Sequence, residues 1–202
     1  MASRLRLTII GFGTAFLLGI TIWLVAGAPG AQGTQENISN GFAGAIRPEI
    51  PAQPLTGLHD ENGTPIKLKK DVTILTFLYT QCKDTCPTTA QQIRATLDKL
   101  QDPPQAIAIS VDPLGDTESS ARTFLASQTL LGRMHFALGP PVALQRQWNI
   151  YGIQPQSNDT DHTASVVLLD KEGRQRIGFP LDKLTPEGLA HDVQALRNEP
   201  TA

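Results

Sequence analysis

An apolar strand, a helix and a second apolar strand follow one another in the middle of this 202-residue chain. Residues 72–79 are β-branched and aromatic, which is typical of a buried strand. Apolar residues recur at helical spacing over 87–100, and residues 106–111 form a second apolar run that ends at an Asp-Pro pair. A strand, a helix and a strand in this order favour a right-handed parallel crossover. The pattern therefore predicts an α/β domain.

The elements that follow complete this domain. Further helices are predicted over 117–127, 142–148 and 185–196, and two hairpin strands over 165–170 and 174–179. A βαβ unit followed by a ββα unit is the thioredoxin arrangement. We therefore expect a thioredoxin-like fold over residues 55–198, with a mixed central sheet flanked by helices.

The first 54 residues differ in composition from the rest of the chain. Arg4 and Arg6 precede an uncharged apolar run over 7–28. At about 1.5 Å per residue, a helix of this length crosses a hydrocarbon core of ~30 Å. We expect a retained transmembrane anchor here, and a cleaved signal peptide is the alternative. Residues 29–54 are rich in small and polar residues without an apolar period, which predicts a flexible linker.

The charges beside the apolar run predict its orientation. Residues 1–6 hold two arginines and no acidic residue, which places the N-terminus in the cytoplasm by the positive-inside rule. The domain then lies on the other side of a single-pass anchor. Because residues 1–6 leave no space for a transit peptide, a bacterial inner membrane fits better than a mitochondrial one. We expect the domain in the periplasm.

Composition argues against several classes of protein. With 40% hydrophobic and 18% charged residues, the chain suits one globular domain with an N-terminal extension. The net charge is −2 and the basic residues are scattered, which argues against nucleic acid as a partner. Two cysteines, four positions apart, exclude a disulfide-rich scaffold. Such a pair usually forms a redox couple or half of a metal site, and a structural disulfide is the plain alternative.

Cys82 and Cys86 lie between the predicted strand 72–79 and the helix, whose first residue is predicted to be Pro87. Ligand sites in open α/β sheets favour that place. Because Pro87 disfavours helical dihedrals at the residue before it, we expect both thiols on a loop at the helix N-terminus. Free N–H groups and the helix dipole there would lower a thiol pKa from about 8.5. Two thiolates can close a disulfide or chelate a soft metal ion, and this spacing allows both.

His162 is a third candidate ligand. It lies in a polar loop, residues 159–164, that leads into the strand predicted from Ser165. In thioredoxin-like folds the loop that enters this strand lies against the cysteine loop. Two thiolates and one imidazole suit Cu(I), and a fourth ligand would also accommodate Cu(II) or Zn(II). Asp84 and Asp161 flank these residues and could orient them, but simple loop solvation explains both equally well.

Other polar residues have structural interpretations. We interpret His59, His135 and His191 as structural rather than ligating. Asp112 precedes a proline in a turn, and Asp116 is the predicted N-terminal cap of the helix that follows it.

Three motifs, taken together, resemble the Sco/SenC family. They are residues 77–87 around the two cysteines, residues 110–113 followed by 116–117, and residues 161–165 with the histidine. The resemblance covers most of residues 55–197. It implies a membrane-anchored thioredoxin-fold protein that binds copper through Cys82, Cys86 and His162. Lys83, Gly115 and Glu118 depart from residues frequent in the family, and none of them removes a ligand.

The resemblance implies a role in assembling the dinuclear copper centre of cytochrome c oxidase subunit II, and two interpretations of it remain. In the favoured one the protein is a copper metallochaperone, not an enzyme, that passes its ion to this subunit or a similar acceptor. In the other it is a thiol–disulfide oxidoreductase that reduces the cysteines of that centre or of another extracytoplasmic partner. A copper or redox sensor comes last, because no signalling segment accompanies the domain.

Overall fold

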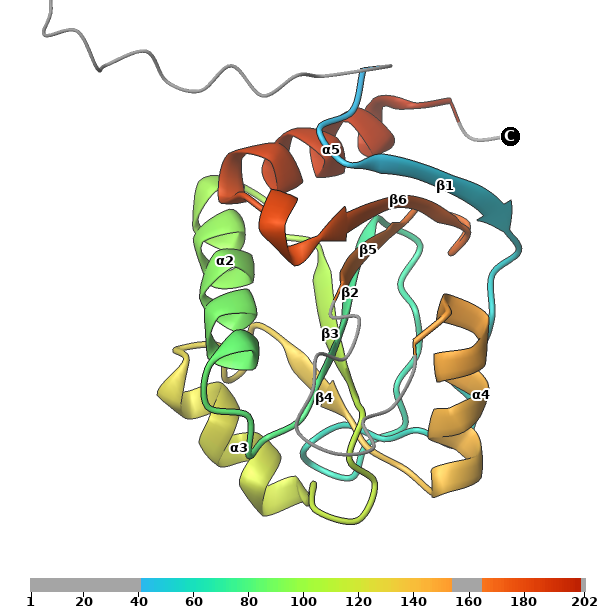
Figure 1. Cartoon of the computed structure of the whole chain (residues 1–202). Helices are drawn as coiled ribbons and strands as arrows, with labels where there is room; N and C mark the ends of the chain where they lie inside the picture. Colours follow the sequence, from blue (N-terminus) through green and yellow to red (C-terminus); the bar gives the residue numbers. More distant parts are fainter. Residues whose placement is uncertain (1–40, 154–164, 201–202) are drawn as a thin grey trace, which may run out of the picture. The chain divides into compact units, whose positions relative to one another are not determined.

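Residues 41–153 and 165–200 are described by the computed structural model drawn in Figure 1. The strands are β1 (Ala45–Ile50), β2 (Thr73–Leu78), β3 (Gln105–Ser110), β4 (His135–Ala137), β5 (Ser165–Leu169) and β6 (Gln175–Pro180). The helices are α2 (Thr85–Lys99), α3 (Glu118–Ser127), α4 (Pro141–Tyr151) and α5 (Pro186–Asn198), with a 3₁₀ turn, η1, over Leu181–Lys183.

The strands form one mixed sheet in the order β1-β6-β5-β2-β3-β4. β2 pairs in parallel with β3, and β3 with β4. β5 pairs antiparallel with both β2 and β6, and β6 pairs antiparallel with β1. The predicted crossover through α2 and the predicted hairpin are therefore confirmed. A mixed sheet flanked by helices fits the thioredoxin-like fold expected from the sequence.

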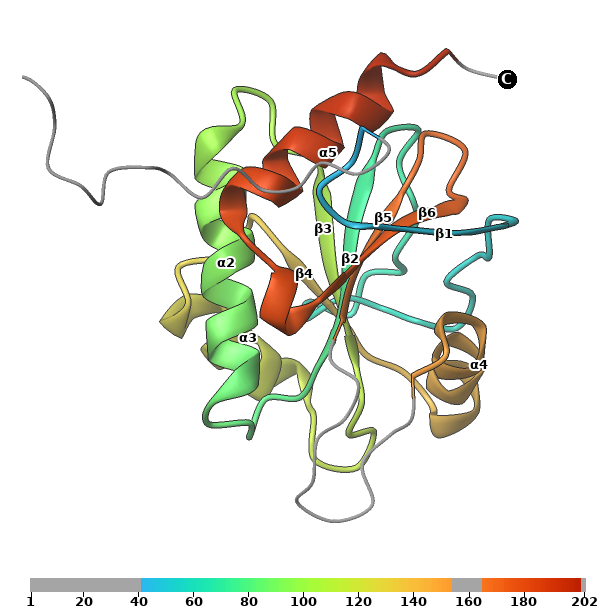
Figure 2. The ribbon, with the colours of Figure 1, turned by 45° about the horizontal axis from the view of Figure 1, so that its top comes forward.

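Helices cover both faces of the sheet. Figures 1 and 2 show α2, α3 and α5 on one side and α4 on the other. Because neighbouring side chains of a strand point to opposite faces, Ile74 and Leu78 pack with α2, α3 and α5. Leu75 and Phe77 pack on the opposite face with α4. Every residue of β2 and β3 is buried, which explains why both strands read as continuous apolar runs.

β1 lies within residues 29–54, for which the sequence predicts a flexible linker, and that prediction does not hold for this strand. Most of its side chains are exposed, so it carries no apolar period from which a strand could be predicted. Backbone contacts stabilise it instead. β1 pairs with β6, and the buried carboxylate of Asp192 on α5 accepts the N–H groups of Ala43 at 2.8 Å and Gly44 at 2.9 Å.

No helix within residues 41–153 and 165–200 combines the length and the apolar composition that a membrane span needs. The anchor expected over 7–28 lies outside these residues and stays a prediction.

Candidate metal centre

Both cysteines lie at the carboxyl end of β2, where the chain enters α2. Cys82 belongs to a turn in which its N–H donates to the carbonyl of Tyr79 at 3.3 Å. Cys86 is the second residue of α2, and its N–H donates to Sγ of Cys82 at 3.1 Å. Both cysteines are free. The start of the helix therefore holds the two cysteines next to each other without a disulfide between them, and a soft metal ion would bind them as thiolates.

The start of α2 differs from the sequence prediction. The helix begins at Thr85 rather than at Pro87, so Cys86 lies in its first turn and not on a preceding loop. Proline is tolerated in a first turn, because the N–H groups there have no partner within the helix. The restriction that proline places on the residue before it is a bias and did not decide the dihedrals here.

The two thiols differ in environment. Cys82 is half-buried, whereas Cys86 is fully buried and belongs to the core cluster beneath α2. Burial raises the pKa of the Cys86 thiol well above its ordinary value, and the hydrogen bond with Cys82 raises this pKa further. The expected lowering of the pKa is therefore wrong for Cys86, because loss of hydration outweighs the helix N-terminus. A metal ion would have to displace the proton from this sulfur.

Asp116 connects the cysteine loop to the end of β3. One carboxylate oxygen accepts the N–H of Thr80 at 2.8 Å, and the other accepts the hydroxyl of Ser110 at 2.5 Å. Burial raises the pKa of Asp116, although these hydrogen bonds act in the opposite direction. The sequence predicts Asp116 as a helix cap, but Thr117 has that role, since its hydroxyl accepts the N–H of Ser120. The sequence held a signal for this contact, because the carboxyl ends of the parallel strands β2 and β3 meet at one edge of the sheet.

We expect Asp116→Ala to lower the free energy of unfolding by about 2 kcal/mol, since it removes the acceptor of two partly buried donors. Amide hydrogen exchange at Thr80 should become faster in the same variant. Asp112→Ala is the matched control, because its carboxylate accepts the N–H of Gly115 in an exposed turn. Denaturant titration of both variants checks the prediction, which fails if they lose equal stability.

The remaining candidate residues are placed only in part. Asp84 lies exposed at the start of α2, and its side chain makes no capping hydrogen bond. Its expected orienting role gains no support from these contacts. His162 and Asp161 lie outside the described residues, so the third ligand and its neighbour stay predictions.

A model of the SCO1/SenC family matches residues 54–198, which include both cysteines and the expected third ligand. The chain belongs to the SCO1/SenC family. The match spans nearly all of the described unit, so the resemblance inferred from three short motifs is confirmed over the whole domain. No curated protein sequence matches the chain.

Solved structures of Sco proteins share this fold. The copper-bound ScoI of Bradyrhizobium japonicum is 29% identical, with a TM-score of 0.57, and the match covers 73% of this chain and 99% of that one. The apo Sco1 of Thermus thermophilus is 25% identical, with a TM-score of 0.62 and coverage of 81% and 99%. The copper-bound Sco1 of yeast is 18% identical, with a TM-score of 0.65, and the match covers 77% of this chain and 92% of that one. At this identity it supports the fold alone.

Proposed function

We propose that this protein is a copper metallochaperone that holds one copper ion through Cys82, Cys86 and His162. The observation that carries the proposal is the pair of free, adjacent cysteines at the carboxyl end of β2. Its support is membership of the SCO1/SenC family and the copper-bound ScoI among the structural relatives. The ion would pass to cytochrome c oxidase subunit II or a similar copper acceptor.

The donor atoms fit copper. Two thiolate sulfurs are soft ligands that select Cu(I) over hard cations, and an imidazole would complete a three-coordinate set. The buried Cys86 would keep water from one side of a bound ion, whereas the half-buried Cys82 would leave the other side open. An acceptor thiolate or imidazole would then be able to approach from that side and replace the ligands one at a time.

We also propose where in the cell this protein lies. Residues 7–28 would anchor the chain in a bacterial inner membrane and hold the domain at the periplasmic surface. A membrane-bound acceptor would then be met by diffusion in two dimensions. The chain from residue 29 would serve as the connection, up to the point where Asp192 holds Ala43 and Gly44 just before β1.

A second candidate function is supported by the unequal exposure of the two cysteines. In a thiol–disulfide oxidoreductase, Cys82 would attack a partner's disulfide as thiolate and form a mixed disulfide. Cys86 would then displace the partner's second sulfur and close an intramolecular disulfide. Two electrons and two protons would pass from the dithiol to the partner, and no metal is needed.

His162→Ala separates the two functions. We expect this variant to retain Cu(I) at least ~10-fold more weakly against a competing chelator, because one of three ligands is lost. Its two cysteines should still reduce a partner's disulfide, and become oxidised to a disulfide themselves, at the rate of the parent protein. His191→Ala is the control, since this half-exposed ring lies on α5 and contacts Asp192.

Retention of Cu(I) at the unchanged affinity would remove His162 from the site. Cells that carry His162→Ala and still assemble the oxidase without added copper would favour the oxidoreductase.

A further inference from the structure

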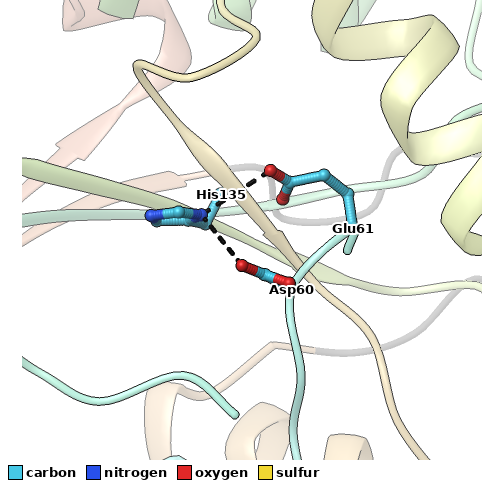
Figure 3. A group of neighbouring side chains, drawn as sticks. All are labelled: Asp60, Glu61 and His135. Atoms are coloured by element: carbon cyan, nitrogen blue, oxygen red, sulfur yellow. Dashed lines mark ion pairs between the residues drawn. The ribbon is translucent and has the colours of Figure 1, made fainter. Parts of the chain in front are cut away.

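A second group of ligand-type side chains lies away from the cysteines, at the β4 edge of the sheet. Asp60 and Glu61 are neighbours in the segment that precedes β2, and His135 is the first residue of β4. Nδ1 of His135 lies 3.6 Å from Oδ2 of Asp60 and 3.7 Å from Oε1 of Glu61. Figure 3 shows this nitrogen facing both carboxylates. One ligand-type atom from each of the three side chains lies within 4.8 Å of the others.

The two carboxylates are held in place by their other hydrogen bonds. The Glu61 side chain is 2% exposed, and its Oε2 accepts the N–H of Phe136 at 3.0 Å. Oδ1 of Asp60 accepts the N–H groups of Asn62 at 2.8 Å and Thr64 at 2.9 Å. Oδ2 of Asp60 and Oε1 of Glu61 lie toward the ring, and Oε1 also accepts the side-chain amide N–H of Asn62 at 3.1 Å. The group is therefore preorganised by backbone contacts from both sides.

The imidazole nitrogen between these oxygens is unsatisfied. Nδ1 of His135 is buried and has no hydrogen-bond partner, although two acceptors lie close to it. Direct N–H···O bonds are about 2.7–3.2 Å long, so the observed separations are too great for either oxygen. Donor atoms bound to one tetrahedral cation at about 2.1 Å lie about 3.4 Å apart, which is close to these separations. These two nitrogen–oxygen separations thus fit atoms that share a cation better than atoms that bond each other.

We propose that Asp60, Glu61 and His135 bind a divalent transition metal ion of the zinc class. One imidazole and two carboxylates are ligands that Zn²⁺ accepts, whereas Mg²⁺ and Ca²⁺ prefer oxygen alone. The group offers no thiolate, which separates it from the soft set at Cys82 and Cys86. The His135 side chain is 40% exposed, so water can reach the ion and complete its coordination.

The expected role of this ion is structural. β4 is an edge strand, two strands away from β2 and its cysteines. His59 already pairs with Leu138 through the backbone, with N–H···O distances of 2.9 and 2.8 Å. A shared ion would fasten the same segment to β4 through side chains and cover the edge more firmly. The proposal therefore does not depend on copper transfer.

The test uses the full chain with Cys82→Ser, Cys86→Ser and His162→Ala, so that the expected copper ligands cannot take up the probe. Equilibrium dialysis against Zn²⁺ should give about one zinc per chain, and zinc should raise the Tm. Adding His135→Gln should weaken zinc binding at least ~10-fold and abolish the rise in Tm. His59→Gln is the matched control, because His59 faces the exposed Glu118 at 3.7 Å and lies outside the group.

Glu61→Gln is a second variant that keeps the side-chain shape and should also weaken zinc binding. Zinc-free samples compared by circular dichroism show whether each variant is folded. The proposal is overturned if the parent retains no zinc, or if His135→Gln and His59→Gln bind it equally. Either result would mean that His135 lies beside the two carboxylates without binding a metal.

Discussion

We expect Cys86→Ser to abolish stoichiometric copper binding, with a loss of copper affinity of more than ~100-fold. A serine hydroxyl has nearly the shape of the thiol, but its oxygen is a hard donor that does not ionise near neutral pH. Cys86 is fully buried, so water cannot easily replace the lost ligand. Copper titration of the reduced protein against a chelator measures the effect.

The protons released on copper uptake provide a second measurement. Because burial raises the pKa of Cys86, this thiol is protonated in the metal-free protein at neutral pH, and copper must displace its proton. Cys86→Ser should therefore release fewer protons to a weak buffer than the parent protein. Gln81→Ala, at an exposed position of the same loop, should change neither measurement. A Cys86→Ser protein that binds one copper at the parent affinity would contradict the proposed centre.

Asp192→Ala should destabilise the domain by about 3 kcal/mol. The carboxylate is fully buried, and its two oxygens accept the N–H groups of Ala43 and Gly44, which lead into β1. Hydrogen bonds to a charged acceptor contribute about 1.5–3 kcal/mol each, and water in the vacated space recovers part of the loss. Denaturant unfolding measures the change in stability. Amide exchange at Ala43 and Gly44 should become faster well before exchange in β2 does.

Asp192→Asn is the informative companion variant. An amide keeps one acceptor oxygen but turns an NH₂ group toward the second backbone N–H, so about half the stability should be lost. His191→Ala removes a ring that contacts the same carboxylate at 2.9 Å, without removing the acceptor, and should have a small effect. If Asp192→Ala costs less than ~1 kcal/mol, β1 is held by its pairing with β6 and not by the carboxylate.

Several elements could be predicted from the sequence because their signals are local. The buried strands β2 and β3 read as apolar runs, and α2 between them has helical spacing of its apolar residues. The hairpin of β5 and β6 has a turn at Gly173, whose φ of 79° favours glycine. The cysteine pair was equally plain, because its spacing and its place before a helix are visible in the chain.

Other features depend on partners that are distant along the chain. β1 is a strand because it pairs with β6, about 130 residues away, and because Asp192, about 150 residues away, holds the two residues just before it. The carboxylate of Asp116 looks like a helix cap in the sequence but bonds the cysteine loop in the fold. His135, interpreted as structural, faces two carboxylates from a segment more than 70 residues earlier.

The sequence by itself determined the fold class, the family and the pair of sulfur atoms, since apolar period and residue spacing are properties of short stretches of chain. The tertiary structure decided which cysteine is only half-buried, how strongly the other cysteine holds its proton and which carboxylates lie beside a histidine. Burial and hydrogen-bond partners arise only when distant segments pack together, and those two quantities set the pKa and the ligand geometry of a site.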